Sequence, residues 1–311
     1  MKWFRNISGR IHGAAPEDEG AERDRLDREI RHLEIRSRRM ARELFSGEYR
    51  SSFKGKGIEF NTVREYQYGD DIRSVDWNTS ARKHDLYVKL FSEERERSLL
   101  LVVDASGSML FGSRHCSKKE LAIEVAAVLA NSAGQNNDKI GLIIFTDRVE
   151  LYLPPRKGRH HLQTIIRSLK SFTPEHRGTN IDAVLSFIRF SRKRQEIIFL
   201  LTDMVDSEYE RGMKLLNNRH DFILVHLLDP LEKSMPVGAM TALSDPETGE
   251  ALWLDAGTRE QCRRYGAEQQ ACHEALRKRL RRLRIDSIFL ETNRSFIREL
   301  NTFFRYRERK A

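Results

Sequence analysis

Short apolar runs alternate with amphipathic stretches along most of the chain. Four runs are almost continuously apolar, as is typical of parallel strands buried on both faces: Ser98–Asp104, Lys139–Thr146, Glu196–Thr202 and Phe222–Leu228. Helical patterns lie between or after them, near 118–134, 159–171, 181–193 and 207–218. This alternation predicts a doubly wound, Rossmann-like α/β fold with a mainly parallel sheet.

Three further elements complete the predicted sheet domain, which we place at residues 98–306. A shorter strand is expected at 148–153, a last strand at Ile285–Leu290 and a closing helix near 294–306. Residues 237–256 interrupt the pattern and predict an inserted hairpin, because Asp245–Gly249 (DPETG) has the composition of a turn.

The chain before residue 98 has a different character. Residues 1–22 resemble a flexible lead-in, and 23–97 form a second region. Its first part, 23–45, predicts a helix whose apolar positions recur at steps of three and four; we expect this helix to pack on its own domain, with partner binding as the alternative. Residues 46–97 are predicted to be irregular, because charges and aromatic side chains are mixed there without a clear period.

The composition of the chain bears on the kind of partner and on the cellular compartment. Lys and Arg exceed Asp and Glu by 55 to 46, which gives a net charge of +9 and favours acidic partners. The three cysteines, Cys116, Cys262 and Cys272, are odd in number and have no CxxC spacing, which argues against a disulfide framework and for a reducing compartment. Without an apolar leader or a membrane-spanning run, the sequence favours a cytoplasmic location.

Polar side chains follow the buried strands where ligands of open α/β sheets bind. Asp104-Ala105-Ser106-Gly107-Ser108 follows the first strand, Thr202-Asp203 ends another, and Gly178-Thr179-Asn180 stands at a loop-to-helix junction between them. Because the carboxyl ends of parallel strands share one rim, all three segments can reach the same place.

The candidate ligands in these segments are two carboxylates and three hydroxyls, without sulfur or imidazole. Oxygen ligands suit a hard cation, and Mg²⁺ in particular binds few carboxylates and keeps several waters. Two carboxylates neutralise a divalent ion, so it can still accept one more anionic oxygen. Gly107 allows a turn tight enough for both serines to face the ion.

In this order, DASGS, GTN and TD resemble the metal-ion-dependent adhesion site (MIDAS) of von Willebrand factor A (vWA) domains. The resemblance implies binding of Mg²⁺, with Mn²⁺ or Ca²⁺ as alternatives, and a partner's Asp or Glu as the last ligand. It implies the following metal ligands, some of them acting through water: Asp104, Ser106, Ser108, Thr179 and Asp203. Two alternatives stay open, namely that these are ordinary capping and turn residues, or that the site is intact but seldom metallated.

A second block of residues lies upstream of the sheet domain. It reads GKGIEF (55–60), VREY (63–66), GDDIR (69–73), DW (76–77), SAR (80–82) and LYVK (86–89). Arginine guanidinium groups in it could form paired bonds to neighbouring carboxylates, which predicts a structural clasp beside the sheet. The arginines are Arg64, Arg73 and Arg82, and the carboxylates are Glu65, Asp70, Asp71 and Asp76.

This block, with the vWA-like part, closely resembles the DUF58 family over residues 40–305. The resemblance implies an adaptor that works with a MoxR-type AAA+ ATPase or its client protein in the assembly or activation of other proteins. The sequence has no GxxxxGK[ST] phosphate loop, no GxSxG elbow and no HExxH zinc motif. We therefore expect a protein-interaction module with no catalytic residues and no cofactor besides the metal.

The sequence also leaves two other functions open. The basic runs at 277–284 and 31–42 would suit a nucleic acid or an acidic membrane surface, although the spacing of 258–283 is that of a helix with one apolar side. A magnesium-dependent hydrolase would need a base near the ion, for which Asp182 or Asp206 could be proposed.

Overall fold

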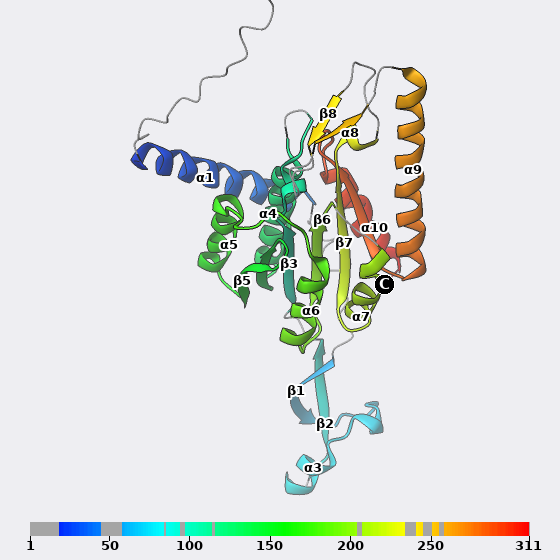
Figure 1. Cartoon of the computed structure of the whole chain (residues 1–311). Helices are drawn as coiled ribbons and strands as arrows, with labels where there is room; N and C mark the ends of the chain where they lie inside the picture. The colour runs from blue at the N-terminus through cyan, green and yellow to red at the C-terminus, as the bar shows by residue number, and fades with distance from the viewer. Residues whose placement is uncertain are drawn as a thin grey trace, which may run out of the picture.

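A six-stranded sheet forms the centre of the molecule (Figure 1). The structure is a computed structural model that describes residues 19–44, 58–83, 85–93, 97–113, 116–203, 207–233, 241–244, 251–254 and 258–310. The strand order is β10-β7-β6-β3-β4-β5, and only β5 runs antiparallel to its neighbour. The strands are β3 (Ser98–Asp104), β4 (Lys139–Phe145), β5 (Val149–Arg156), β6 (Ile197–Thr202), β7 (Asp221–Leu228) and β10 (Asp286–Glu291).

Helices cover both faces of the sheet, as a doubly wound fold requires. One face packs against α1 (Glu19–Leu44), α4 (Lys118–Gln135), α5 (Arg159–Ser171) and α10 (Ile297–Lys310). The other packs against α6 (Ile181–Ser191), α7 (Glu210–Asn217) and α9 (Arg259–Arg282). The mainly parallel α/β fold predicted from the sequence is therefore confirmed.

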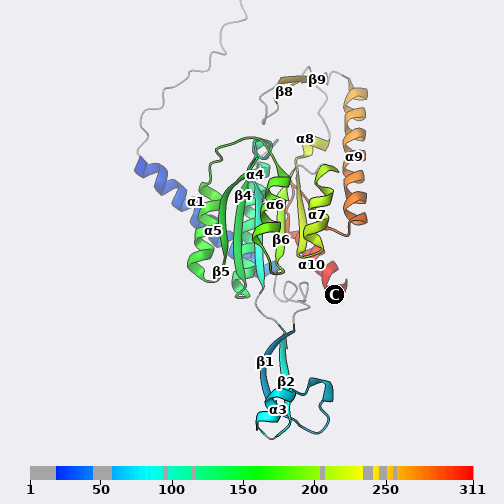
Figure 2. The ribbon, with the colours of Figure 1, turned by 60° about the horizontal axis from the view of Figure 1, so that its bottom comes forward.

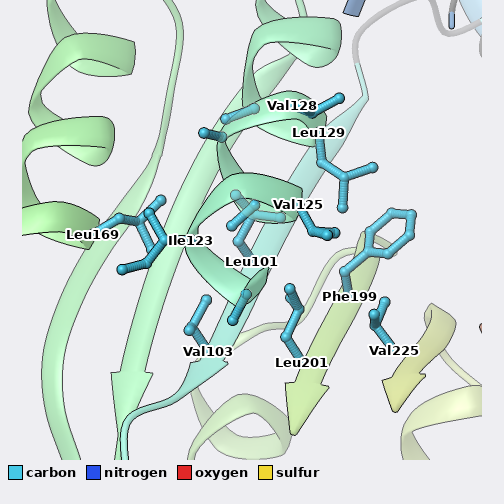
Figure 3. Close-up of a cluster of buried hydrophobic side chains, with 14 of the residues drawn as sticks. Leu101, Val103, Ile123, Val125, Val128, Leu129, Leu169, Phe199, Leu201 and Val225 are labelled. Atoms are coloured by element: carbon cyan, nitrogen blue, oxygen red, sulfur yellow. The ribbon is translucent and has the colours of Figure 1, made fainter. Parts of the chain in front are cut away.

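Strand β3 divides the hydrophobic core between the two faces. Leu101 and Val103 point toward α4, where Figure 3 shows them near Val125, while Leu100 and Val102 belong to the cluster on the opposite face. All four are almost completely buried. Side chains that alternate between two helical layers explain why this strand is continuously apolar.

The order of the strands reverses beside β3. From β3 the chain continues to β4 and β5 on one side, then returns to place β6, β7 and β10 on the other. The carboxyl ends of β3 and β6 therefore lie next to each other at the switch point, which is where ligands bind in open α/β sheets.

Strand β5 closes one edge of the sheet with two successive prolines, Pro154 and Pro155. The ring of Pro155 packs directly over Gly141 in β4, where a Cβ atom would lie only 2.8 Å from the proline Cγ. Glycine at this position lets the proline-bearing strand approach its neighbour.

The N-terminal helix α1 packs against α4 of the sheet domain within the same chain, in line with the expectation that it packs on this protein and not on a partner. Ile30 and Ala41 are buried, and Asn131 of α4 donates a hydrogen bond of 2.9 Å from Nδ2 to Ser37 Oγ. Arg36 of α1 forms an ion pair of 2.8 Å with Glu124 of the same α4.

Residues 58–93 differ from the irregular segment expected there. They form an arm in which β1 (Ile58–Glu65) and β2 (Tyr87–Glu93) pair antiparallel, with η1 (Ile72–Ser74) and α3 (Trp77–Lys83) between them. Figure 2 shows this arm projecting from one end of the sheet. The prediction that this segment forms a structural clasp beside the sheet is therefore wrong. The paired strands satisfy one another's backbone groups and need no support from the main sheet.

Inside the arm, one of the predicted arginine–carboxylate pairs is present. Arg64 donates from both terminal nitrogens to Asp70 at 2.7 Å each. Arg73 and Arg82 form no ion pair within the described residues, and the carboxylate of Asp76 instead accepts hydrogen bonds from the start of α3.

The inserted hairpin is also present as two short antiparallel strands. These are β8 (Thr241–Ser244) and β9 (Ala251–Leu254), which follow the short helix α8 (Pro230–Lys233). The predicted turn at 245–249 lies outside the described residues. None of the helices that the structure describes combines the length and apolar character needed to cross a membrane.

Candidate functional site

Four of the five predicted ligands meet at the switch point. Asp104 ends β3, and its Oδ1 accepts a hydrogen bond of 2.9 Å from the backbone nitrogen of Ser106. The Oγ atoms of Ser106 and Ser108 lie 3.1 Å apart, and Ser108 Oγ donates to Asp203 Oδ1 at 3.0 Å. The loops after β3 and β6 are thus joined through the side chains singled out in the sequence.

The fifth residue, Thr179, lies on a loop attached to this group. The backbone nitrogen of Gly107 donates to the carbonyl oxygen of Arg177 at 2.8 Å, and Asn180 donates its own backbone N–H to the carbonyl of Thr146. Thr179 is half-buried between these two anchored residues. The main chain therefore places the GTN segment against the serine loop.

The alternative that these segments hold ordinary capping and turn residues is met in part, because the Asp104 side chain accepts the backbone N–H of Ser106 two residues on, as in an Asx turn. Asn180 caps α6, because its side chain accepts a hydrogen bond from Ala183 N at 3.0 Å. Ser106 stands before the short η2 (Gly107–Leu110) without any capping bond from its side chain. The hydroxyl of Ser106 instead lies 3.1 Å from that of Ser108, which in turn donates to Asp203.

Asp104 is a buried carboxyl group in an unfavourable electrostatic environment. Its side chain is almost inaccessible, and burial together with the nearby charge of Asp203 raises its pKa to about 6. Thr202 Oγ1 donates to its Oδ2 at 2.6 Å, which offsets part of this cost. A cation beside Asp104 would favour its ionised form.

A buried lysine supports the other carboxylate. The Nζ atom of Lys118, at the start of α4, lies 2.5 Å from Asp203 Oδ2 and 2.5 Å from Glu232 Oε1. Burial alone would lower the pKa of Lys118, but the two carboxylates raise it above its ordinary value. The ammonium group of Lys118 pairs with two carboxylates, and Asp104 adds a third close to Asp203, so carboxylates outnumber ammonium groups among these residues.

A second carboxylate network ties the surrounding loops together. Asp229, fully buried after β7, accepts hydrogen bonds from Ser113 N at 3.0 Å, Thr292 Oγ1 at 2.7 Å and Leu231 N at 2.9 Å. The loops after β3, β7 and β10 therefore share one polar anchor. This sharing restrains the rim on which the site stands.

Apolar side chains are exposed beside the acidic group. Leu110 and Phe111, directly after the serine loop, are 58% and 37% exposed, and Leu231 on α8 is also exposed. Arg177 lies exposed on the neighbouring loop. Large apolar side chains around a polar centre are typical of protein-binding surfaces.

Sequence reasoning missed Lys118 and Glu232 as members of the site, and it named Thr202 beside Asp203 without giving it a role. Two successive lysines begin α4, and nothing in the sequence separates Lys118, which enters the site, from Lys119, which donates to the carbonyl of Phe172. Thr202 could have been included, because it immediately precedes Asp203 at a strand end. Glu232 comes from α8 and gives no sequence signal.

Some of the residues behind the alternative functions are already engaged with other parts of the chain. In the basic run of α9, Arg279 and Arg282 both pair with Glu210, and Arg277 stacks on Phe289. Asp182 is exposed in the first turn of α6 and faces Gly212 of α7. Asp206, the other proposed base, lies outside the described residues.

Comparison with known proteins places the chain in a family. Residues 62–275 match the family described as "Protein of unknown function DUF58". The Mycobacterium tuberculosis protein Rv1480 is 27% identical over 289 residues, covering 91% of this chain and 90% of its own length.

Similar solved structures include BatB from Bacteroides thetaiotaomicron and the SpRpn10 VWA domain. The first has a TM-score of 0.45 and 16% identity over 69% of this chain and 100% of its own. The second has a TM-score of 0.38 and 10% identity over 66% of this chain and 93% of its own. Because the family match covers most of its length, the chain belongs to the DUF58 family.

Proposed function

We propose that this chain is a non-enzymatic adaptor that binds an acidic side chain of a partner protein through a divalent cation. Asp104, Ser106, Ser108, Thr179 and Asp203 would hold the ion, with Mg²⁺ as the expected metal. A bound ion would supply an electrophilic position for one more carboxylate oxygen. The chain's own residues would supply the orientation and the surrounding surface.

The observation that carries this proposal is the buried Asp104 carboxyl group beside Asp203 and two serine hydroxyls. Burial, together with the nearby charge of Asp203, raises the pKa of Asp104, and Lys118 contacts Asp203 rather than Asp104 in the ion pairs of the site. The available donors are oxygens, which suit a hard cation. The residues therefore fit the group that the vWA resemblance implies.

The rim around the site supports a protein as the ligand. Leu110 and Phe111 would add apolar contact next to the coordinated carboxylate, and Arg177 would favour an acidic partner. A net charge of +9 for the whole chain acts in the same direction. The DUF58 resemblance suggests a MoxR-type AAA+ ATPase, or a client of that ATPase, as the partner.

The first test is metal binding by the purified chain. We expect Mg²⁺ at about 100 times its dissociation constant to raise the free energy of unfolding by about 2.7 kcal/mol. Asp104→Asn should abolish this gain. Without Mg²⁺ at pH 7.5, the same variant should be more stable than wild type by about 1 kcal/mol, because no buried carboxyl has to ionise. Urea unfolding with Mg²⁺ or EDTA measures both effects.

Asp182→Asn is the matched control, since it removes an exposed carboxylate near the same rim. It should leave the Mg²⁺ effect unchanged. Equal Mg²⁺ stabilisation of wild type and Asp104→Asn would show that the ion binds elsewhere and would exclude the proposed site.

The second test concerns the partner. The chain should capture a MoxR-type ATPase or its client in Mg²⁺ and lose most of it in excess EDTA, and Asp104→Asn should show the same loss in Mg²⁺. Capture that persists undiminished in EDTA would argue against a metal-mediated contact even if the ion binds.

A further inference from the structure

The tip of the β1–β2 arm exposes large apolar side chains far from the site described above. Trp77 is 65% exposed and Leu86 48%, while Tyr68 and Ile72, on the segment between β1 and α3, are more exposed still. Side chains of this size are costly to leave in water when they are clustered. Their concentration on one projection indicates a binding surface.

Trp77 and Leu86 line a hollow in this tip of about 710 Å³. The backbone nitrogen of Tyr66 donates to the carbonyl of Leu86 at 2.8 Å, which places the ends of β1 and β2 across from each other. The lining residues are Glu65, Tyr66, Trp77, Ser80, Ala81, Asp85 and Leu86.

Hydrogen bonds and an ion pair hold the backbone around the hollow in place, and they do not involve the Trp77 and Leu86 side chains. Asp70 is bound by Arg64 through both carboxylate oxygens, and Asp76 accepts hydrogen bonds from Asn78 N and Thr79 N at the start of α3. Ser80 Oγ accepts the backbone N–H of Tyr87 at 2.8 Å. A held frame lowers the entropy lost when a ligand binds.

The charge of the hollow favours a basic ligand. Glu65 and Asp85 are exposed carboxylates, and in the part of the chain that the structure describes neither side chain has a hydrogen bond or an ion pair. The lining contains no Lys or Arg, although the whole chain is basic. A planar guanidinium could stack on the Trp77 indole and bond to a carboxylate at its edge.

We propose that the arm tip binds a partner-protein segment that presents an arginine beside an apolar side chain. The arginine would lie over Trp77 between Glu65 and Asp85, and the apolar neighbour would contact Leu86. This surface is independent of the metal, because the arm joins β3 at its amino end and Asp104 stands at the carboxyl end. One chain could therefore hold an acidic partner at one end and a basic one at the other.

The test uses Trp77 itself as the reporter. The chain has three tryptophans, so Trp3→Phe with Trp253→Phe leaves Trp77 as the single indole. The probe is the peptide acetyl-Leu-Arg-Leu-amide, and its control contains uncharged citrulline in place of arginine. In EDTA, we expect the arginine peptide to quench Trp77 fluorescence saturably, with half of the effect at a peptide concentration of about 1 mM. The citrulline peptide should bind at least about tenfold more weakly.

Variants separate the proposed contacts from general charge effects. Glu65→Gln with Asp85→Asn should weaken binding of the arginine peptide about tenfold. Glu208→Gln with Glu260→Gln removes two exposed carboxylates elsewhere and should not weaken it.

Three results with the peptides would overturn the proposal. They are equal affinity for the two peptides, unchanged affinity in the Glu65→Gln/Asp85→Asn variant, and no response of the Trp77 signal. Sedimentation that shows a dimer abolished by Trp77→Ala would assign the hollow to a second copy of this chain and would equally refute a separate partner. Because metal is absent throughout, failure here leaves the proposed cation site standing, and the reverse also holds.

Discussion

Replacing Lys118 by methionine is expected to lower the free energy of unfolding by about 3–5 kcal/mol in the absence of Mg²⁺. Methionine keeps much of the length of the side chain but removes the ammonium group between Asp203 and Glu232. The Asp203 side chain is only 4% exposed, so its charge would be left buried without compensation. Urea unfolding at pH 7.5 in EDTA measures the loss.

Two further variants show whether the loss comes from this ion pair. Lys119→Met changes the neighbouring lysine, which is only half-buried and donates to a carbonyl oxygen, and should cost much less. Adding Asp203→Asn to Lys118→Met should restore much of the stability, because the uncompensated charge disappears. Wild-type stability in Lys118→Met alone would contradict the role assigned to this lysine.

Acid is expected to destabilise the chain through histidines that are buried in the neutral form. Burial, aided by the nearby positive charges of His273 and Lys118, lowers the pKa of His226 to about 3, and burial also lowers that of His220 to about 4. In the unfolded chain, both bind a proton near pH 6.5. Their stabilising contribution is therefore complete above pH 6.5 and is lost as the pH falls toward the folded values.

His226 alone should account for about 2–3 kcal/mol of lost stability between pH 7.5 and 4.5. Asp104 acts in the opposite direction, since its raised folded pKa adds stability as the pH falls from 6 toward 3.8. The measurement is therefore the difference between wild type and His226→Leu in urea unfolding at the two pH values.

The matched control for His226→Leu is Phe289→Leu, which alters the ring packed against His226 without removing a titrating group. Phe289→Leu should lower stability about equally at both pH values. If the free energy of unfolding of His226→Leu fell between pH 7.5 and 4.5 as much as that of wild type, His226 would not be a cause of the acid destabilisation.

The sheet domain could be predicted closely from sequence, and the arm could not. Strand β3 and helix α5 have the residue ranges that the sequence predicted. Strand β3 is buried on both faces and is therefore continuously apolar, whereas α5 buries one side and has apolar residues at helical spacing. In β1 the alternation is broken by a register shift between Phe60 and Thr62, so the period of two is lost. A strand pair that shares little apolar core leaves only a weak pattern in sequence.

The residues of the candidate site that follow the ends of strands could be predicted from the sequence. Asp104, Ser108 and Asp203 come together because they follow adjacent parallel strands, which the strand order makes inevitable. Lys118 could not be distinguished from Lys119, because only the rotation of α4 on the sheet decides which ammonium turns inward. Glu232 reaches the site through tertiary placement of α8 alone.

The paired prolines of β5 also limit how this protein can assemble. Pro154 and Pro155 offer no N–H groups, so over that stretch of the edge another chain could not complete a regular ladder of hydrogen bonds. Because Gly141 has no side chain, the proline-bearing part of β5 can pack closely against β4. Growth of fibrils by edge-to-edge strand addition is therefore blocked there by the covalent structure of the strand itself.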